Sequence, residues 1–74
     1  MGKLKVLSGN EICKILSQHG FAEIRQKGSH RIMQLLQENT TVTVPVPIHK
    51  EVKLGTLQSI IRQSRLPRNL FEIS

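Results

Sequence analysis

The chain has 74 residues, enough for one small domain over residues 1–74, and its formal net charge of +6 favours an anionic partner. It has neither Trp nor Tyr and only two Phe, so aromatic platforms for stacking single-stranded bases are not expected. It has no apolar run of membrane-spanning length, and its N-terminus is too short and too charged for a secretory signal. Its single cysteine, Cys13, suits a reducing compartment. We therefore expect a cytoplasmic protein.

The first predicted element is a helix over about residues 9–19. Ser8 is a good N-cap, and Glu11 three residues later completes a capping box. Gly20 supplies the left-handed residue that ends the helix. One face carries apolar residues at helical spacing, namely Ile12, Ile15 and Leu16. Cys13 is expected to be a small buried residue of this helix.

Three strands follow, at about residues 21–26, 30–37 and 41–44, with turns at 27–29 and 38–40. Phe21 and Ile24 are expected to face inward. Two faces compete for burial in the second strand, and the sequence leaves the choice open. One face carries His30, Ile32, Gln34 and Leu36, and the other carries Arg31, Met33 and Leu35. Pro45 and Pro47 cannot donate ladder hydrogen bonds, so they end the third strand or place it on an edge.

A second helix is predicted over about residues 55–65 and stops before Pro67. Its inward face carries Leu57, Ile60 and Ile61. We expect Leu70, Phe71 and Ile73 to form a last short helical turn that packs on the core.

The predicted order is therefore helix, three strands, helix. A meander of three strands gives an antiparallel sheet, and two helices on one face of it make an α+β two-layer sandwich. Double-stranded-RNA-binding domains have this α-β-β-β-α arrangement.

The stretch Lys27-Gly28-Ser29-His30-Arg31 carries the clearest chemical signal. It places an imidazole, the side chain best suited to proton transfer near neutral pH, between two cations. Cations attract a polyanion, so this pattern suggests cleavage of a phosphodiester. RNA is favoured as substrate because its 2′-hydroxyl is an internal nucleophile.

The chain also resembles the HicA, or YcfA-like, toxins of bacterial type II toxin–antitoxin systems. The pieces that carry the resemblance are Ser8-Gly9 with Glu11, Gly20-Phe21, the signature Arg25-Gln26-Lys27-Gly28-Ser29-His30, Thr41-Val42-Thr43-Val44-Pro45, and Leu54-Gly55-Thr56-Leu57 with Ile60-Ile61. The chain departs from the family pattern at Glu38-Asn39, where Asp-Gly is common, at Leu54, where proline is frequent, and in the second strand, which lacks the usual aromatic residue.

The resemblance implies a double-stranded-RNA-binding fold, ribosome-independent cleavage of mRNA, and neutralisation by a HicB-type antitoxin. It also implies that His30 is the essential catalytic residue. The candidate RNA-binding residues are Lys27, Gly28, Ser29, Arg31, Lys53 and Arg62. His49 is a candidate auxiliary proton carrier, whereas His19 is expected to be structural. We expect neither a metal nor another cofactor, because His30, His49, Cys13 and Glu51 show no ligand spacing of a known site.

Two other functions fit the same residues. The first is a non-catalytic double-stranded-RNA-binding module in which His30 is structural. The second is an interaction protein whose basic face docks an acidic protein. Cleavage of RNA and binding of RNA at physiological salt distinguish these functions from a toxin ribonuclease.

Overall fold

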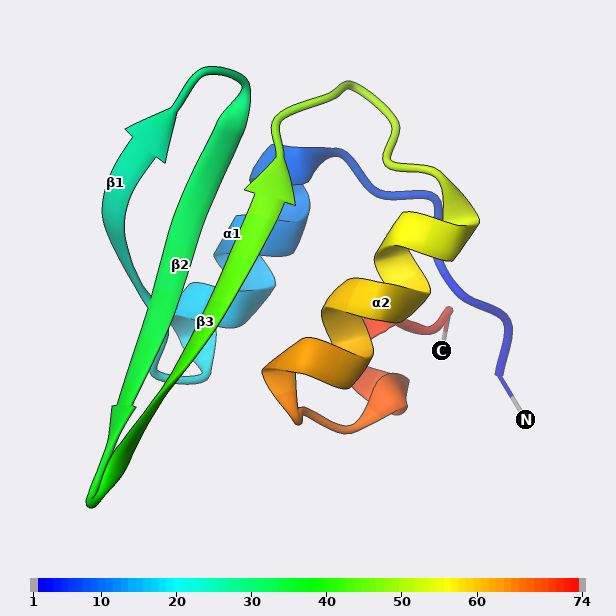
Figure 1. Ribbon diagram of the computed structural model, residues 1–74. Helices are drawn as coiled ribbons and strands as arrows, with labels where there is room; N and C mark the ends of the chain where they lie inside the picture. The colour runs from blue at the N-terminus through cyan, green and yellow to red at the C-terminus, as the bar shows by residue number, and fades with distance from the viewer. Residues whose placement is uncertain (1, 74) are drawn as a thin grey trace.

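The computed structural model describes residues 2–73 and has the predicted order of elements (Figure 1). The elements are α1 (Gly9–Gln18), β1 (Ala22–Lys27), β2 (His30–Gln37), β3 (Thr40–Pro47), α2 (Leu54–Ser64) and a 3₁₀ helix, η1 (Arg68–Phe71). The strands form an antiparallel sheet in the order β1-β2-β3, and both helices cover one face of it. The α+β sandwich predicted from the sequence is thus confirmed. No helix within residues 2–73 has the length and apolar character to cross a membrane.

The sheet face toward the helices is set by β3. Its alternate valines, Val42, Val44 and Val46, are buried, and Val44 lies opposite Met33 of β2, which is 1% exposed. Side chains on a strand alternate between faces, so Arg31, Met33 and Leu35 point toward the helices. His30 and the other even-numbered residues of β2 therefore point to the open face. The tertiary structure resolves the choice between the two faces that the sequence left open.

Both prolines lie inside β3, and the sheet tolerates them because β3 is an edge strand. The amide of Ile48 donates to the Ser29 carbonyl at 2.7 Å. Backbone groups alternate direction along a strand, so the nitrogens of Pro45 and Pro47 lie on the outer edge, where no ladder donor is needed. These prolines also leave that end of the edge without two of the N–H groups that an added strand would use.

The expectation that Ile24 faces inward is wrong. Its side chain is 50% exposed, and the pairing of β1 with β2 shifts register between Glu23 and Arg25. A bulge of this kind inserts one unpaired residue and re-aims the side chains around it. Phe21, in contrast, is buried as predicted.

The ends of α1 match the sequence signals. The Ser8 hydroxyl accepts from the Glu11 amide at 3.1 Å, and the Glu11 carboxylate accepts from the Ser8 amide at 2.8 Å. Gly20 has a φ of 94°, which allows the Phe21 amide to donate to the Leu16 carbonyl at 3.1 Å. Capping at both ends fixes the helix length and places Phe21 in the core.

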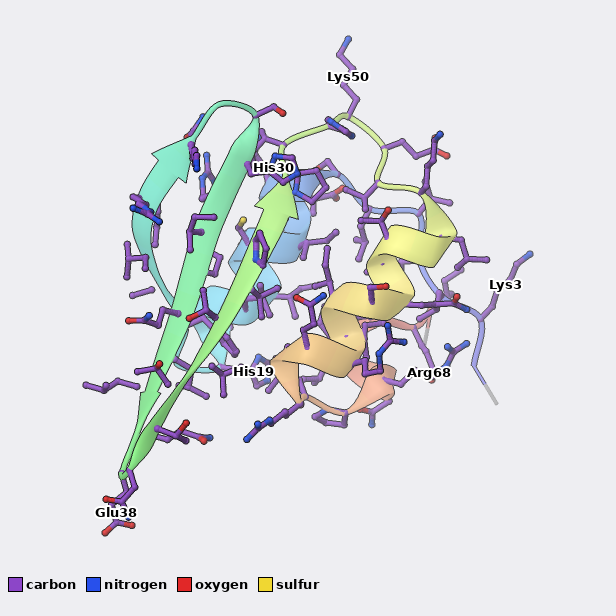
Figure 2. All side chains as sticks on the ribbon, viewed as in Figure 1. Lys3, His19, His30, Glu38, Lys50 and Arg68 are labelled. Atoms are coloured by element: carbon purple, nitrogen blue, oxygen red, sulfur yellow. The ribbon has the colours of Figure 1, made fainter. Side chains whose placement is uncertain are left out.

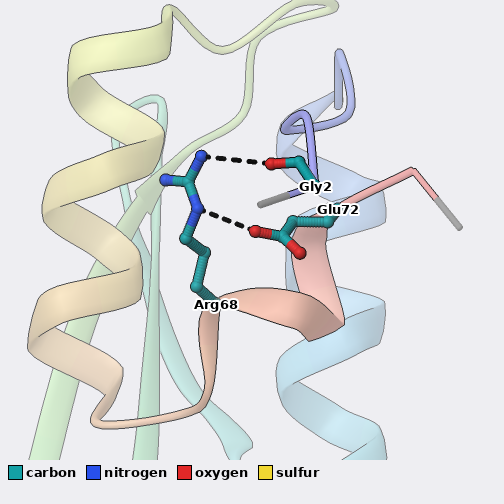
Figure 3. A network of polar contacts seen from close by, with 3 residues as sticks. All are labelled: Gly2, Arg68 and Glu72. Atoms are coloured by element: carbon teal, nitrogen blue, oxygen red, sulfur yellow. Dashed lines mark hydrogen bonds and ion pairs between the residues drawn. The ribbon is translucent and has the colours of Figure 1, made fainter.

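The two ends of the chain lie side by side. Leu4 pairs with Glu72 in an antiparallel bridge, and Arg68 Nε donates to Glu72 Oε2 at 2.8 Å beside the Gly2 carbonyl (Figure 3). The predicted last helical turn is η1, and Phe71 within it is fully buried. Ile73 lies beyond η1 and is 56% exposed, so the expectation that it packs on the core is wrong.

Candidate functional site

His30 is the first residue of β2, and side-chain alternation from the buried Met33 places it on the open face of the sheet. Figure 2 shows it at the end of the sheet where β3 leads into the loop before α2. Its side chain is exposed. Lys27 of β1 and Pro47 of β3 are its cross-strand neighbours. Directly opposed residues on one face have Cβ atoms about 4.5–5.5 Å apart, so Lys27 supplies a positive charge next to the imidazole.

The turn before His30 is held in its shape by the conformation of Gly28 and by two hydrogen bonds. Gly28 has a φ of 59°, a left-handed conformation that side-chain-bearing residues rarely adopt, and a Cβ there would meet open space. The Gln26 side chain donates to the Gly28 carbonyl at 3.4 Å, and the Ser29 carbonyl accepts from Ile48. Ser29 is itself exposed, and the turn therefore presents its outer surface to solvent beside His30.

The loop at residues 48–53 starts next to His30 and is fixed to the first turn of α1. The Gly9 amide donates to the His49 carbonyl at 2.9 Å. A Cβ on Gly9 would lie 2.7 Å from Ile48 Cα and would also meet the Pro47 carbonyl oxygen, so only glycine allows this close approach. His49, two residues after the cross-strand partner of His30, is thereby held at the same end of the sheet.

The charges at this end of the molecule are mainly positive. Lys50 extends from the same loop at the His30 end, whereas Glu38 lies at the opposite tip of the β2–β3 hairpin (Figure 2). Glu51 is the acidic residue of the loop. With Lys27 opposite His30, the positive charges at this end of the sheet favour the approach of an anion.

Arg31, which flanks His30 in sequence, lies on the other side of the sheet. Its Nε is 3.4 Å from Glu23 Oε1, at ion-pair distance, and it is buried without a hydrogen-bond acceptor among residues 2–73. Burial raises the pKa of the Cys13 thiol on α1, and the nearby Arg31 guanidinium partly opposes this rise. Arg31 is therefore part of the helix-covered layer and does not share the open face with His30.

The two candidate RNA contacts on α2 lie in the helix layer. Lys53 is the N-cap of the helix and makes no side-chain capping bond. Arg62 is in the last turn and its guanidinium is 3.3 Å from the Ser59 hydroxyl. Nine residues of helix separate their Cα atoms by about 13 Å along the axis. Lys53 is thus at the end of α2 that follows the His49 loop, and Arg62 is two to three turns away from it.

His19 and Cys13 lie where their side chains support the fold: His19 at the end of α1 and Cys13 in the core. His19 Nδ1 is 2.9 Å from the Ile15 carbonyl at the end of α1, and Figure 2 shows it well away from His30. Cys13 is 4% exposed and belongs to the core, as predicted. Within the described part of the chain, no three His, Cys, Asp or Glu side chains gather closely enough to hold a metal ion.

Sequence reasoning missed the role of Gly9. It identified Ser8-Gly9 only as the opening of a helix, whereas the structure shows that Gly9 lets α1 contact the β3–α2 loop beside His30. Nothing local in the sequence distinguishes this glycine from one that merely begins a helix. The contact spans about 40 residues of sequence and exists only in the folded chain.

Comparison with known families agrees with the resemblance read from the sequence. Residues 9–66 match the family described as the HicA toxin of bacterial toxin–antitoxin systems. The match includes both helices, all three strands and the turn before His30. A search of curated proteins found no match to the chain. Because the matched region covers most of the 74 residues, the chain belongs to the HicA toxin family.

Proposed function

We propose that this protein is a ribosome-independent endoribonuclease toxin that cleaves mRNA in the cytoplasm and is neutralised by a HicB-type antitoxin. The observation that carries the proposal is the exposed imidazole of His30, beside Lys27 on the open face of the sheet, in a chain of the HicA toxin family. The family supports a toxin role, and the exposed position of His30 beside Lys27 supports the proposed chemistry. Residues 1–74 act as one toxin domain in this proposal.

The reaction needs two proton transfers. The ribose 2′-oxygen attacks the adjacent phosphorus, the bond from phosphorus to the 5′-oxygen breaks, and the products carry a 2′,3′-cyclic phosphate and a 5′-hydroxyl. A general base takes the proton from the 2′-hydroxyl, and a general acid protonates the leaving 5′-oxygen. His30 serves as one of these two groups. One imidazole does not easily serve as both within a single step.

The second proton carrier in this scheme is solvent or another side chain, and His49 is the candidate side chain. Its loop is fixed to α1 at the His30 end of the sheet, and the residue is exposed. The His49→Ala variant should then cut more slowly than wild type but faster than His30→Ala. If His49→Ala cuts at the wild-type rate, His49 is not the second carrier, and solvent or a different side chain takes that role.

RNA approaches this site from the open face of the sheet. Lys27 stabilises the negative charge that develops on the phosphate, and the exposed backbone at Gly28 and the Ser29 hydroxyl are hydrogen-bond donors to phosphate oxygens. Lys53 and Arg62 add phosphate contacts on α2 if the substrate is long enough to reach them.

The deciding experiment is cleavage of a long mRNA by the purified wild type, His30→Ala and His19→Ala in EDTA. His19 is the matched control, because it is also an exposed histidine but lies far from His30. We expect wild type and His19→Ala to cut and His30→Ala to lose at least 100-fold in rate, since general acid–base catalysis contributes about 10²–10⁴-fold.

Three other results would change the conclusion. Full activity of His30→Ala would refute the role of His30. Cutting that disappears in EDTA and returns with one divalent ion would refute metal independence. RNA binding without any cutting by the wild type would favour a non-catalytic double-stranded-RNA-binding module. A pull-down with His30→Ala and the protein of the neighbouring reading frame tests the antitoxin separately from catalysis.

A further inference from the structure

A groove of about 350 Å³ lies between the N-terminal segment and the start of α2. Its floor is apolar and consists of buried side chains, namely Leu4, Val52 and Leu57. Lys3 and Arg68, which line it, lie on the side of the molecule away from His30 in Figure 2. The size is within the range of specific ligand pockets, about 300–1,000 Å³. We call it the N-terminal groove.

Two aliphatic side chains stand exposed on its walls. Val6 is 73% exposed on the N-terminal segment, and Leu54 is 58% exposed in the first turn of α2. They are among the most exposed large hydrophobic residues described, and they face one groove instead of being scattered over the surface. An apolar concave surface with exposed aliphatic walls gains from excluding water, so it suits a peptide segment with an aliphatic side chain. No aromatic residue lines the groove, so nucleic-acid bases have nothing there to stack on.

The rim of the groove carries an excess of positive charge. Lys3 and Lys5 belong to the N-terminal wall and form no ion pair within residues 2–73. The charge of Arg68 is compensated by Glu72 at 2.8 Å (Figure 3). Glu51 is the acidic residue of the lining, on the loop opposite the N-terminal wall. A partner is therefore complementary when its acidic side chains lie toward Lys3 and Lys5.

We propose that the N-terminal groove binds a segment of the antitoxin that inserts an aliphatic side chain between Val6 and Leu54 and places acidic side chains against Lys3 and Lys5. This inference rests on the proposed antitoxin partnership and deepens it. Lys3 and Arg68 of the groove lie away from His30 in Figure 2, and His30 does not line the groove, so this contact anchors the antitoxin without occupying the imidazole. Binding of the antitoxin and cleavage of RNA are then separable by mutation.

The test is calorimetric titration of the purified antitoxin from the neighbouring reading frame into the full chain. The variants are Val6→Ser, Leu54→Ser and Lys5→Glu, with Leu36→Ser as the matched control. Leu36 is 78% exposed but lies near the far tip of the β2–β3 hairpin. We expect each groove variant to weaken antitoxin binding by about tenfold, because Val6→Ser and Leu54→Ser each remove an apolar contact and Lys5→Glu reverses a charge, and we expect Leu36→Ser to bind like wild type.

Free Val6→Ser and Leu54→Ser should cleave RNA at the wild-type rate. Both side chains are already exposed, so replacing them leaves the core intact, and both variants should have the Tm of the wild type in thermal unfolding. Lys5→Arg should restore binding relative to Lys5→Glu, since it restores the charge.

Unchanged antitoxin affinity in the groove variants would overturn this inference and leave the proposed ribonuclease function intact. An equal loss in Leu36→Ser would also overturn it, because the effect would then not be specific to the groove. Loss of RNA binding in Leu54→Ser would make the groove a nucleic-acid surface, and a shift from dimer to monomer in light scattering would make it a self-association surface. A wild-type chain that cuts RNA but does not bind the antitoxin would refute both this inference and the HicB partnership, while leaving the catalytic role of His30 standing.

Discussion

Replacing Gly9 by alanine tests the contact that joins α1 to the loop beside His30. The added Cβ would lie 2.7 Å from Ile48 Cα and 3.0 Å from the Pro47 carbonyl carbon, and it would also meet the Pro47 oxygen. All three neighbours are backbone atoms, so no side chain can rotate away. Either the helix or the loop must move, and the hydrogen bond from the Gly9 amide to His49 must lengthen.

Overpacking of this kind costs about 1–3 kcal/mol of unfolding free energy. Alanine's better helix propensity offsets up to about 1 kcal/mol of that cost. From the middle of these two ranges we expect a net loss of about 1–2 kcal/mol in Gly9→Ala. For a domain of this size, about 4–8 °C of Tm accompanies each kcal/mol, so the Tm should fall by about 5–15 °C.

Gly55→Ala is the matched control. Gly55 is also a helical glycine near a helix start, but a Cβ there would meet nothing within 4 Å. The same substitution should stabilise the protein by about 0.4–1 kcal/mol, because it reduces the freedom of the unfolded chain without a clash. The opposite signs at the two glycines isolate the steric term from propensity.

Thermal unfolding followed by far-UV circular dichroism measures both variants. RNA cleavage, measured well below either Tm, should fall in Gly9→Ala, because the Pro47–His49 segment is displaced next to His30. A Gly9→Ala variant as stable as wild type, or one shifted in the same direction as Gly55→Ala, would refute the reasoning. The close approach would then not constrain the fold.

Two further predictions concern charge. Lys27→Ala should reduce the slope of log binding constant against log salt by about 0.7–0.9 in RNA titrations, the contribution of one phosphate contact, whereas Arg31→Ala should leave that slope unchanged and lower the Tm; equal slopes in wild type and Lys27→Ala would contradict the open-face assignment. The pKa of Glu11 is lowered below 4.5, first by the hydrogen bond from the Ser8 amide, so its contribution to stability is present above pH 4.5 and lost as pH falls through the folded-state value. Glu11→Gln keeps the capping geometry and should flatten the pH dependence of Tm below pH 4.5, and an unchanged acid limb would show that the capping carboxylate does not contribute.

Much of the fold was predictable because local signals agreed with one another. The capping box at Ser8 and Glu11, the left-handed glycine at Gly20 and the β-branched third strand each specify their element within a few residues of sequence. The β1 bulge was not predictable in this way, because a register shift depends on how two strands pair across the sheet. Ile24 was placed inward for that reason and is exposed.

The candidate site divides in the same manner. The sequence by itself determined that an imidazole follows a glycine turn and a lysine, because these residues are consecutive and the turn at Gly28 needs a left-handed residue. Arg31 was named as an RNA-contact candidate because it flanks His30 in the chain, although strand alternation already put the two residues on opposite faces. In a strand, adjacent side chains point to opposite faces. Met33 is buried against Val44 on the side of the helices, so Arg31 lies on that side too and His30 lies on the open face.

What only the tertiary structure decided is which distant segments meet. The contact of Gly9 with Pro47 and Ile48, and the groove between the N-terminal segment and α2, each join residues that are about 40 to 50 positions apart in the chain. Such contacts depend on the packing of helices on the sheet as a whole, and no local pattern encodes them. The sequence determined the order of elements and the identity of the chemical groups, because capping, turns and strand alternation act between near neighbours in the chain. The face of the sheet on which each side chain lies followed from the burial of one common core.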